Sequence, residues 1–108
     1  MNDLLEKINA LIDASTGDVD EIEHTLTDGY AQAMSLEADR WRLERRIAAI
    51  AGEIECGDVA AKAHELGGLA TRLETNEGEL RQLRARLADL RRVANIARVS
   101  VTAGAPSA

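Results

Sequence analysis

The chain has 108 residues, of which 45% are hydrophobic and only 2% aromatic, and it carries a net charge of −6 at pH 7. This length predicts one domain, and the absence of phenylalanine together with a single proline favours long helices over a sheet. The acidic balance argues against nucleic acid as a partner. No apolar run approaches the roughly 20 residues of a membrane span, and a single cysteine fits a reducing compartment. We therefore expect a cytoplasmic protein with no membrane partner.

The first predicted element is a short amphipathic helix over residues 3–14. Its apolar residues share one helical face: Leu4, Leu5, Ile8, Leu11 and Ile12. Gly17 suits the end of this helix, because glycine readily adopts the left-handed conformation found after many helix C-termini.

Two long helices are predicted next, over residues 19–55 and 59–99. Asp18 is suited to cap the first and Asp58 the second, since an aspartate side chain accepts hydrogen bonds from the free N–H groups of the first turn. Gly57 marks the stop between the two helices.

Alternating spacings of three and four residues run through both long helices, from Val19 in the first and from Val59 in the second. The average period of about 3.5 residues keeps an apolar seam facing a partner helix, as in coiled coils. The link between the helices is too short for parallel packing, so we expect an antiparallel pair. Residues whose numbers sum to 116 should share a layer, which sets the small Gly29 opposite the large Leu87.

The predicted fold is therefore all-α: a short N-terminal helix followed by a long antiparallel helical hairpin of the coiled-coil type. One helical domain is predicted over residues 1–101. Residues 102–108, which are small apart from a proline, are expected to form a flexible tail.

Polar residues interrupt the seam, and the predicted register places two of them opposite each other: Arg40 and Asn76. A buried polar layer fixes register at a cost in stability. We interpret this pair as a register-setting polar layer, with the Arg40 guanidinium able to reach the rim because long cationic side chains extend towards water.

A stripe of apolar residues lies beside the seam of the second helix: Tyr30, Met34, Trp41, Ala48 and Ala51. One interpretation is that the N-terminal helix folds back and covers it. A twelve-residue helix spans about 18 Å, so it would cover Tyr30 at its edge and leave Met34 and Trp41 exposed. Because aromatic and methionine side chains are enriched at interfaces, we expect Tyr30, Met34, Trp41 and Ala48 to form a partner surface.

No constellation of residues predicts chemistry. His24 and His64 face outward and lie far apart, and with Cys56 they do not have the spacing of metal ligands or of a nucleophile and its base. Gly67 and Gly68 form no phosphate loop, since neither a strand nor a following Lys-Ser/Thr is present; they indicate a weak point in the helix or a hinge. We expect no catalytic residue, cofactor, metal or small-molecule ligand.

These features predict a non-enzymatic helical adaptor that packs against a protein partner, either a second copy or a helical client. The stretches GDVDEIEHTLTDGY and LETNEGELRQLRARLADLRR, with the size, acidity and architecture of the chain, are similar in general pattern to small export chaperones of flagellar and type III secretion systems. That resemblance implies binding of a secreted client's helix. Hairpins of the type VII pathway carry Trp-x-Gly at the turn, where this chain has Cys56-Gly57-Asp58.

Two other interpretations stay open. The first is a structural homo-oligomerisation module, a dimeric four-helix bundle without a client. The second is a small all-helical enzyme of the chorismate mutase type, whose chemistry needs cationic side chains converging in an apolar pocket. Arg40 is the arginine that the seam offers for that role.

Overall fold

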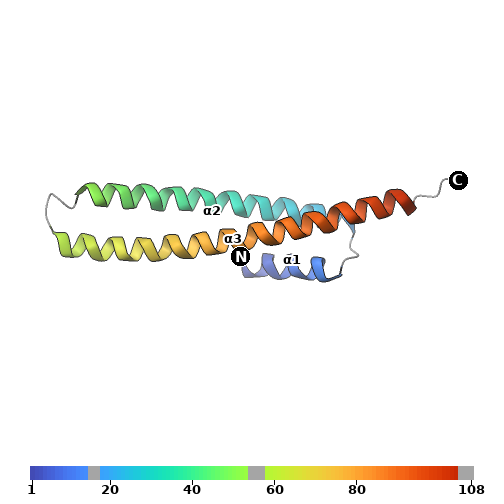
Figure 1. The fold of residues 1–108 in the computed structure, drawn as a ribbon, viewed down its shortest axis with the longest axis horizontal. Helices are drawn as coiled ribbons and strands as arrows, with labels where there is room; N and C mark the ends of the chain where they lie inside the picture. The colour runs from blue at the N-terminus through green and yellow to red at the C-terminus, as the bar shows by residue number, and fades with distance from the viewer. Residues whose placement is uncertain (15–17, 54–57, 105–108) are drawn as a thin grey trace. The chain divides into compact units, whose positions relative to one another are not determined.

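The computed structural model describes residues 1–14, 18–53 and 58–104, with side chains up to residue 99. Three helices and no strand occur in this part of the chain: α1 (Asn2–Ala14), α2 (Val19–Glu53) and α3 (Val59–Gly104) (Figure 1). The predicted all-α class and the hairpin of α2 and α3 are confirmed. The predicted stops at Gly17 and Gly57 lie outside the described residues, as does Cys56.

The third helix is longer than predicted. It ends at Gly104 rather than near residue 99, so residues 102–104 of the expected tail are helical, and residues 105–108 lie outside the described residues. No proline precedes Pro106 in this stretch, so nothing before Gly104 blocks helix propagation.

Aspartate caps begin both long helices, as the sequence predicts. The backbone N–H of Asp20 donates to Asp18 Oδ1 at 3.1 Å, and the N–H of Ala61 donates to Asp58 Oδ1 at 3.3 Å. Each carboxylate satisfies a backbone donor that has no partner within the helix. These two caps fix where α2 and α3 start.

The chain divides into two compact units. The three-helix unit comprises Met1–Ala33 and Gln82–Ala108, and the two-helix unit comprises Met34–Arg81. We number the heptads from a at Val19 and at Val59, so that a and d positions form the seam. In an antiparallel pair the g positions of both helices flank one side of the seam, and the e positions flank the other.

The core of the three-helix unit follows the predicted register. A Cβ built on Gly29 would overlap Leu87 Cδ2 and would lie 3.3 Å from Leu87 Cγ, so this layer pairs as expected. Ile8, Ile22, Leu83 and Leu90 are completely buried. On the e side, Arg91 Nη1 donates to Tyr30 Oη at 3.1 Å, and Arg98 pairs with Glu23. Both pairings match the antiparallel arrangement.

The burial pattern places the N-terminal helix on the side of α2 opposite to the one that the fold-back interpretation of the stripe assigned to it. Tyr30, at an e position, is 39% exposed, whereas Thr25, at a g position, is fully buried. A g position in a coil of two helices stays in contact with water, so we infer that α1 covers this side through its buried Leu5, Ile8 and Leu11. The e side is filled by the polar pairs of Tyr30 and Glu23, which leaves it a poor site for an apolar helix face.

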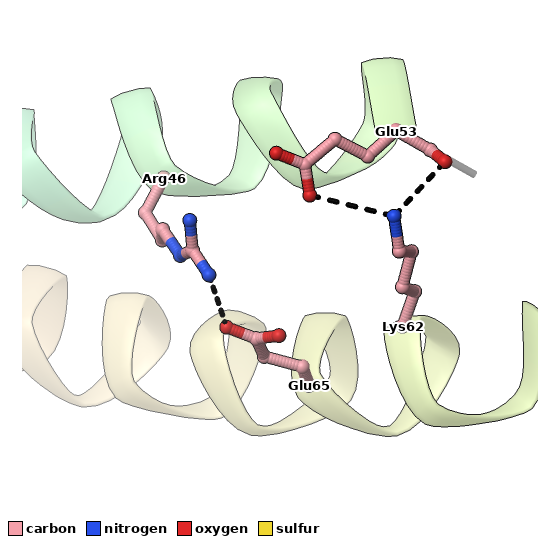
Figure 2. Close-up of polar contacts among 4 residues, drawn as sticks. All are labelled: Arg46, Glu53, Lys62 and Glu65. Atoms are coloured by element: carbon pink, nitrogen blue, oxygen red, sulfur yellow. Dashed lines mark hydrogen bonds and ion pairs between the residues drawn. The ribbon is translucent and has the colours of Figure 1, made fainter. Parts of the chain in front are cut away.

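The two-helix unit has a thinner core and is also held by polar contacts near the end of α2 and the start of α3. Arg46 Nη2 donates to Glu65 Oε1 at 2.9 Å across the pair (Figure 2). Lys62, at a d position, reaches the end of α2, where its Nζ donates to the Glu53 carbonyl oxygen at 3.1 Å and lies 3.5 Å from Glu53 Oε2. A cation there also suits the negative end of the helix dipole.

The seam of the two-helix unit is less buried than that of the three-helix unit. Four of its apolar seam residues are half-buried: Leu43, Ile47, Leu66 and Leu73. Only α2 and α3 contribute to this unit, and two helices leave both flanks of a seam open to water. The difference in burial therefore follows from the missing third helix.

Candidate functional site: an exposed aromatic surface and a groove beside the seam

The predicted partner surface is exposed on the outer face of α2. In the two-helix unit, Met34 is 69% and Trp41 is 59% exposed, and Ala48 is also exposed. The guanidinium carbon of Arg45 lies 4.5 Å from the Trp41 ring centroid. Arg45 follows Trp41 by one helical turn, so the contact is local to α2, and a cation over the ring face stabilises one orientation of the indole.

Tyr30 differs from the other members of the predicted surface. It belongs to the three-helix unit, and its hydroxyl accepts a hydrogen bond from Arg91. We therefore define the aromatic surface as Met34, Trp41 and Ala48, and we assign Tyr30 to the packing of α2 against α3.

Arg40 and Asn76, the predicted polar layer, have different surroundings. The Asn76 side chain is 7% exposed, and its Nδ2 donates to the carbonyl oxygen of Leu36 at 3.0 Å. The Arg40 side chain is 43% exposed; its Nε donates to Glu44 Oε1 at 2.8 Å, and its Nη2 lies 3.5 Å from Glu77 Oε1. Arg40 thus reaches the rim, as its length allows, while Asn76 is tied to the backbone of α2.

A groove of about 590 Å³ is lined in part by Asn76 and lies wholly within the two-helix unit. Most of its residues occupy d, g and c positions, so we call it the g-side groove. Its apolar lining is Leu36, Leu43 and Leu69, and its polar lining includes Asp39, Arg42, Arg46, Arg72, Thr75, Asn76 and Glu79.

The polar groups of the groove are only partly satisfied. Asn76 Oδ1 is buried and has no hydrogen-bond donor within the described residues. Arg42 pairs with Asp39 at 2.6 Å and Arg46 with Glu65 at 2.9 Å. No polar partner of Arg72 or of Glu79 is present in the part of the chain that the structure describes. The groove therefore presents an unused acceptor, an unpaired cation and an unpaired anion.

Sequence reasoning did not identify this groove, nor the contact between Arg45 and Trp41. Trp41 and Arg45 are four residues apart on one helix, and this spacing could have predicted their contact. Sequence reasoning also did not identify the exposed Ile96 and Val99 on α3, which lie beside a small surface depression with Arg92 and Asn95.

The remaining candidate residues stay apart. His24 and His64 are exposed, and among the described residues no three His, Cys, Asp or Glu side chains gather closely enough to hold a metal ion. A Cβ on Gly67 or Gly68 would meet nothing within 4 Å, so no described segment packs on them.

Comparisons with known proteins give no further information on the chain. No family model matches it, and neither a curated protein nor a solved structure matches it. None of the helices that the structure describes is both long and apolar enough to cross a membrane.

Proposed function

We propose that the protein is a cytoplasmic, non-enzymatic helical adaptor that packs its helices against a client protein. The observation that supports this most strongly is the exposure of Met34 and Trp41 on the outer face of α2. Aromatic, methionine and arginine side chains are enriched at protein interfaces, and binding hot spots are enriched in tryptophan, tyrosine and arginine. Trp41 with Arg45 across its ring is suited to anchor a client.

An export-chaperone role is the specific form of this proposal that agrees with the sequence resemblance. In that role the helix of a secreted client would lie along α2 with an apolar residue against Trp41, as amphipathic helices do in hydrophobic grooves. The client-binding residues are then Met34, Trp41 and Ala48.

A second candidate function is a homodimeric module, a four-helix bundle without a client. The half-buried Leu43, Ile47 and Leu66 of the two-helix unit favour it, because packing against another pair of helices would remove them from water. An enzyme of the chorismate mutase type has less support, since the Arg40 guanidinium pairs with Glu44 and Glu77 at the rim.

The adaptor proposal is tested by replacing Trp41 with alanine and measuring folding and client capture from native lysate. Because Trp41 is mostly exposed, Trp41→Ala should leave the free energy of unfolding within about 0.5 kcal/mol of the wild type. It should weaken client binding by about 2 kcal/mol or more if the indole is a hot spot. Ile96→Ala is the matched control, since Ile96 is 58% exposed in the other unit.

Two results for Trp41→Ala, and one for the control, would contradict this proposal. One is a loss of roughly 3–5 kcal/mol in stability for Trp41→Ala, which is the cost of removing a buried tryptophan. The other is equal capture of the same client by the wild type and by the Trp41→Ala variant. Capture that falls equally in Ile96→Ala would also assign binding to a general apolar effect rather than to the aromatic surface.

A further inference from the structure

The g-side groove is separate from the aromatic surface, and the adaptor proposal does not use it. We propose that this groove binds a second copy of the chain, with residues 70–81 of α3 in one copy running antiparallel to the same residues in the other. The two-fold axis passes between Thr75 and Asn76. The inference goes beyond the adaptor role, because it assigns a self-association surface to residues other than Met34 and Trp41.

The buried oxygen of Asn76 is the first observation that supports a ligand in the groove. Asn76 is 7% exposed, it lines the groove, and its Oδ1 receives no hydrogen bond within the described residues. A buried acceptor without a donor lowers stability, so such groups nearly always have a partner. The proposed axis brings the second copy's Thr75 hydroxyl, an O–H donor, over Asn76. A shift of the side chains that cover Asn76 Oδ1 would let the two groups bond, and the symmetry provides the same arrangement twice.

The charges beside Asn76 identify the second copy as that partner. Arg72 and Glu79 both line the groove, and neither has an ion-pair partner in the described part of the chain. They are seven residues apart on one face of α3, about 10.5 Å at 1.5 Å per residue. An axis halfway between them places Arg72 of each copy opposite Glu79 of the other. The groove is therefore complementary to itself, as a two-fold interface requires.

The other charges of the groove do not oppose this pairing. Asp39 pairs with Arg42 on α2, and Arg46 pairs with Glu65 across the seam, so each is neutralised within its own copy. A second copy would also cover the half-buried Leu43. In the three-helix unit we infer that α1 covers the g side, and the seam there is more completely buried. A second copy would cover the g side of the two-helix unit in the same way.

The test exchanges the charges of Arg72 and Glu79 and measures sedimentation of the full chain over a roughly hundredfold range of concentration. The fraction of dimer rises with the concentration of the chain, so this range yields a dissociation constant. Arg72→Glu and Glu79→Arg should each raise the dissociation constant of the dimer at least tenfold, about 1.4 kcal/mol, because symmetry creates the repulsive contact twice. The double variant R72E/E79R restores both ion pairs and should return the dissociation constant to within about threefold of the wild type. Circular dichroism should show wild-type helicity throughout, because Arg72 is exposed, Glu79 is half-buried, and neither has an ion-pair partner among the described residues.

A matched control is available on another face of the same helix. Glu74 and Arg81 are also seven residues apart, are exposed and lie outside the groove. Glu74→Arg and Arg81→Glu should leave the dimer unchanged.

Three results would overturn the proposal: a wild-type chain that stays monomeric at every concentration, a dimer that tolerates Arg72→Glu, or a double variant that fails to recover. None of them bears on client capture through Trp41, so failure here is distinct from failure of the adaptor proposal.

Discussion

The close approach of Gly29 to Leu87 gives the sharpest prediction about the register of α2 and α3. Alanine normally stabilises a helix interior over glycine by about 0.8–1.0 kcal/mol. At Gly29, however, an added methyl group would overlap Leu87 Cδ2, and Leu87 is 2% exposed with little room to move. Overpacking a core costs about 1–3 kcal/mol. Gly29→Ala should therefore lower the free energy of unfolding, by up to about 2 kcal/mol.

Gly78→Ala is the matched control, because a Cβ there would meet nothing within 4 Å. It should stabilise the chain by roughly the full helix-propensity difference of about 0.8–1.0 kcal/mol. Thermal melts followed by circular dichroism resolve the opposite signs, since 1 kcal/mol shifts the melting temperature of a domain of this size by roughly 4–8 °C.

A double-mutant cycle then tests whether Leu87 is the cause. Leu87→Ala alone should cost about 2–5 kcal/mol through the cavity it leaves. In that background the methyl group of Gly29→Ala enters the vacated space, so the change at residue 29 should become stabilising. The expected coupling is at least about 1 kcal/mol. If Gly29→Ala and Gly78→Ala stabilise the wild type equally, the layer of Gly29 and Leu87 is wrong.

Three further predictions follow from buried or capping groups. Asn76→Leu removes an acceptor without a donor. In urea titration of the dilute chain it should raise the unfolding free energy by about 1–3 kcal/mol. An unchanged or lower value would show that the oxygen is satisfied. Ile8→Ala empties a fully buried site of α1 and should cost about 2–5 kcal/mol, whereas Lys7→Ala, exposed on the same helix, should change little in the same titration. Asp58→Ala removes the cap of α3 and should cost about 1 kcal/mol, read from thermal melts; no loss would mean that the cap is dispensable.

The register of the hairpin and the first residues of α2 and α3 could be predicted because they depend on patterns along the sequence. The alternation of three and four residues locates the seam of both helices, and the size contrast of Gly29 and Leu87 selects one antiparallel register. Asp18 and Asp58 bond to amides two and three residues away, so their role as caps is a local property.

The side covered by α1 could not be predicted in the same way. The seam pattern is equally compatible with a third helix on either flank, and Thr25, the residue that marks the covered flank, resembles an ordinary surface threonine in the sequence. Its hydroxyl donates to the Glu21 carbonyl oxygen at 2.9 Å, and this bond within the helix permits its full burial. The choice of flank depends on three-dimensional packing rather than on a periodic signal.

The g-side groove was missed for a related reason. Asn76 was predicted to share a layer with Arg40. Its side chain bonds to a backbone oxygen, that of Leu36, and a bond to the backbone cannot be inferred from the side chains of the sequence. The unpaired state of Arg72 and Glu79 is likewise visible only once the positions of all neighbouring charges are known.

Hydrogen exchange measured by mass spectrometry at low and high chain concentration tests most directly whether the two-helix unit is an interaction surface. At low concentration, amides near Leu43 and Leu73, where the seam is half-buried, should exchange faster than those near Ile22 and Leu90, because exchange rates follow local stability. At high concentration, peptides that cover residues 69–79 should become more protected, while those of the three-helix unit should not change. Protection that is uniform at both concentrations, or that rises only in the three-helix unit, would contradict the assignment of the g-side groove.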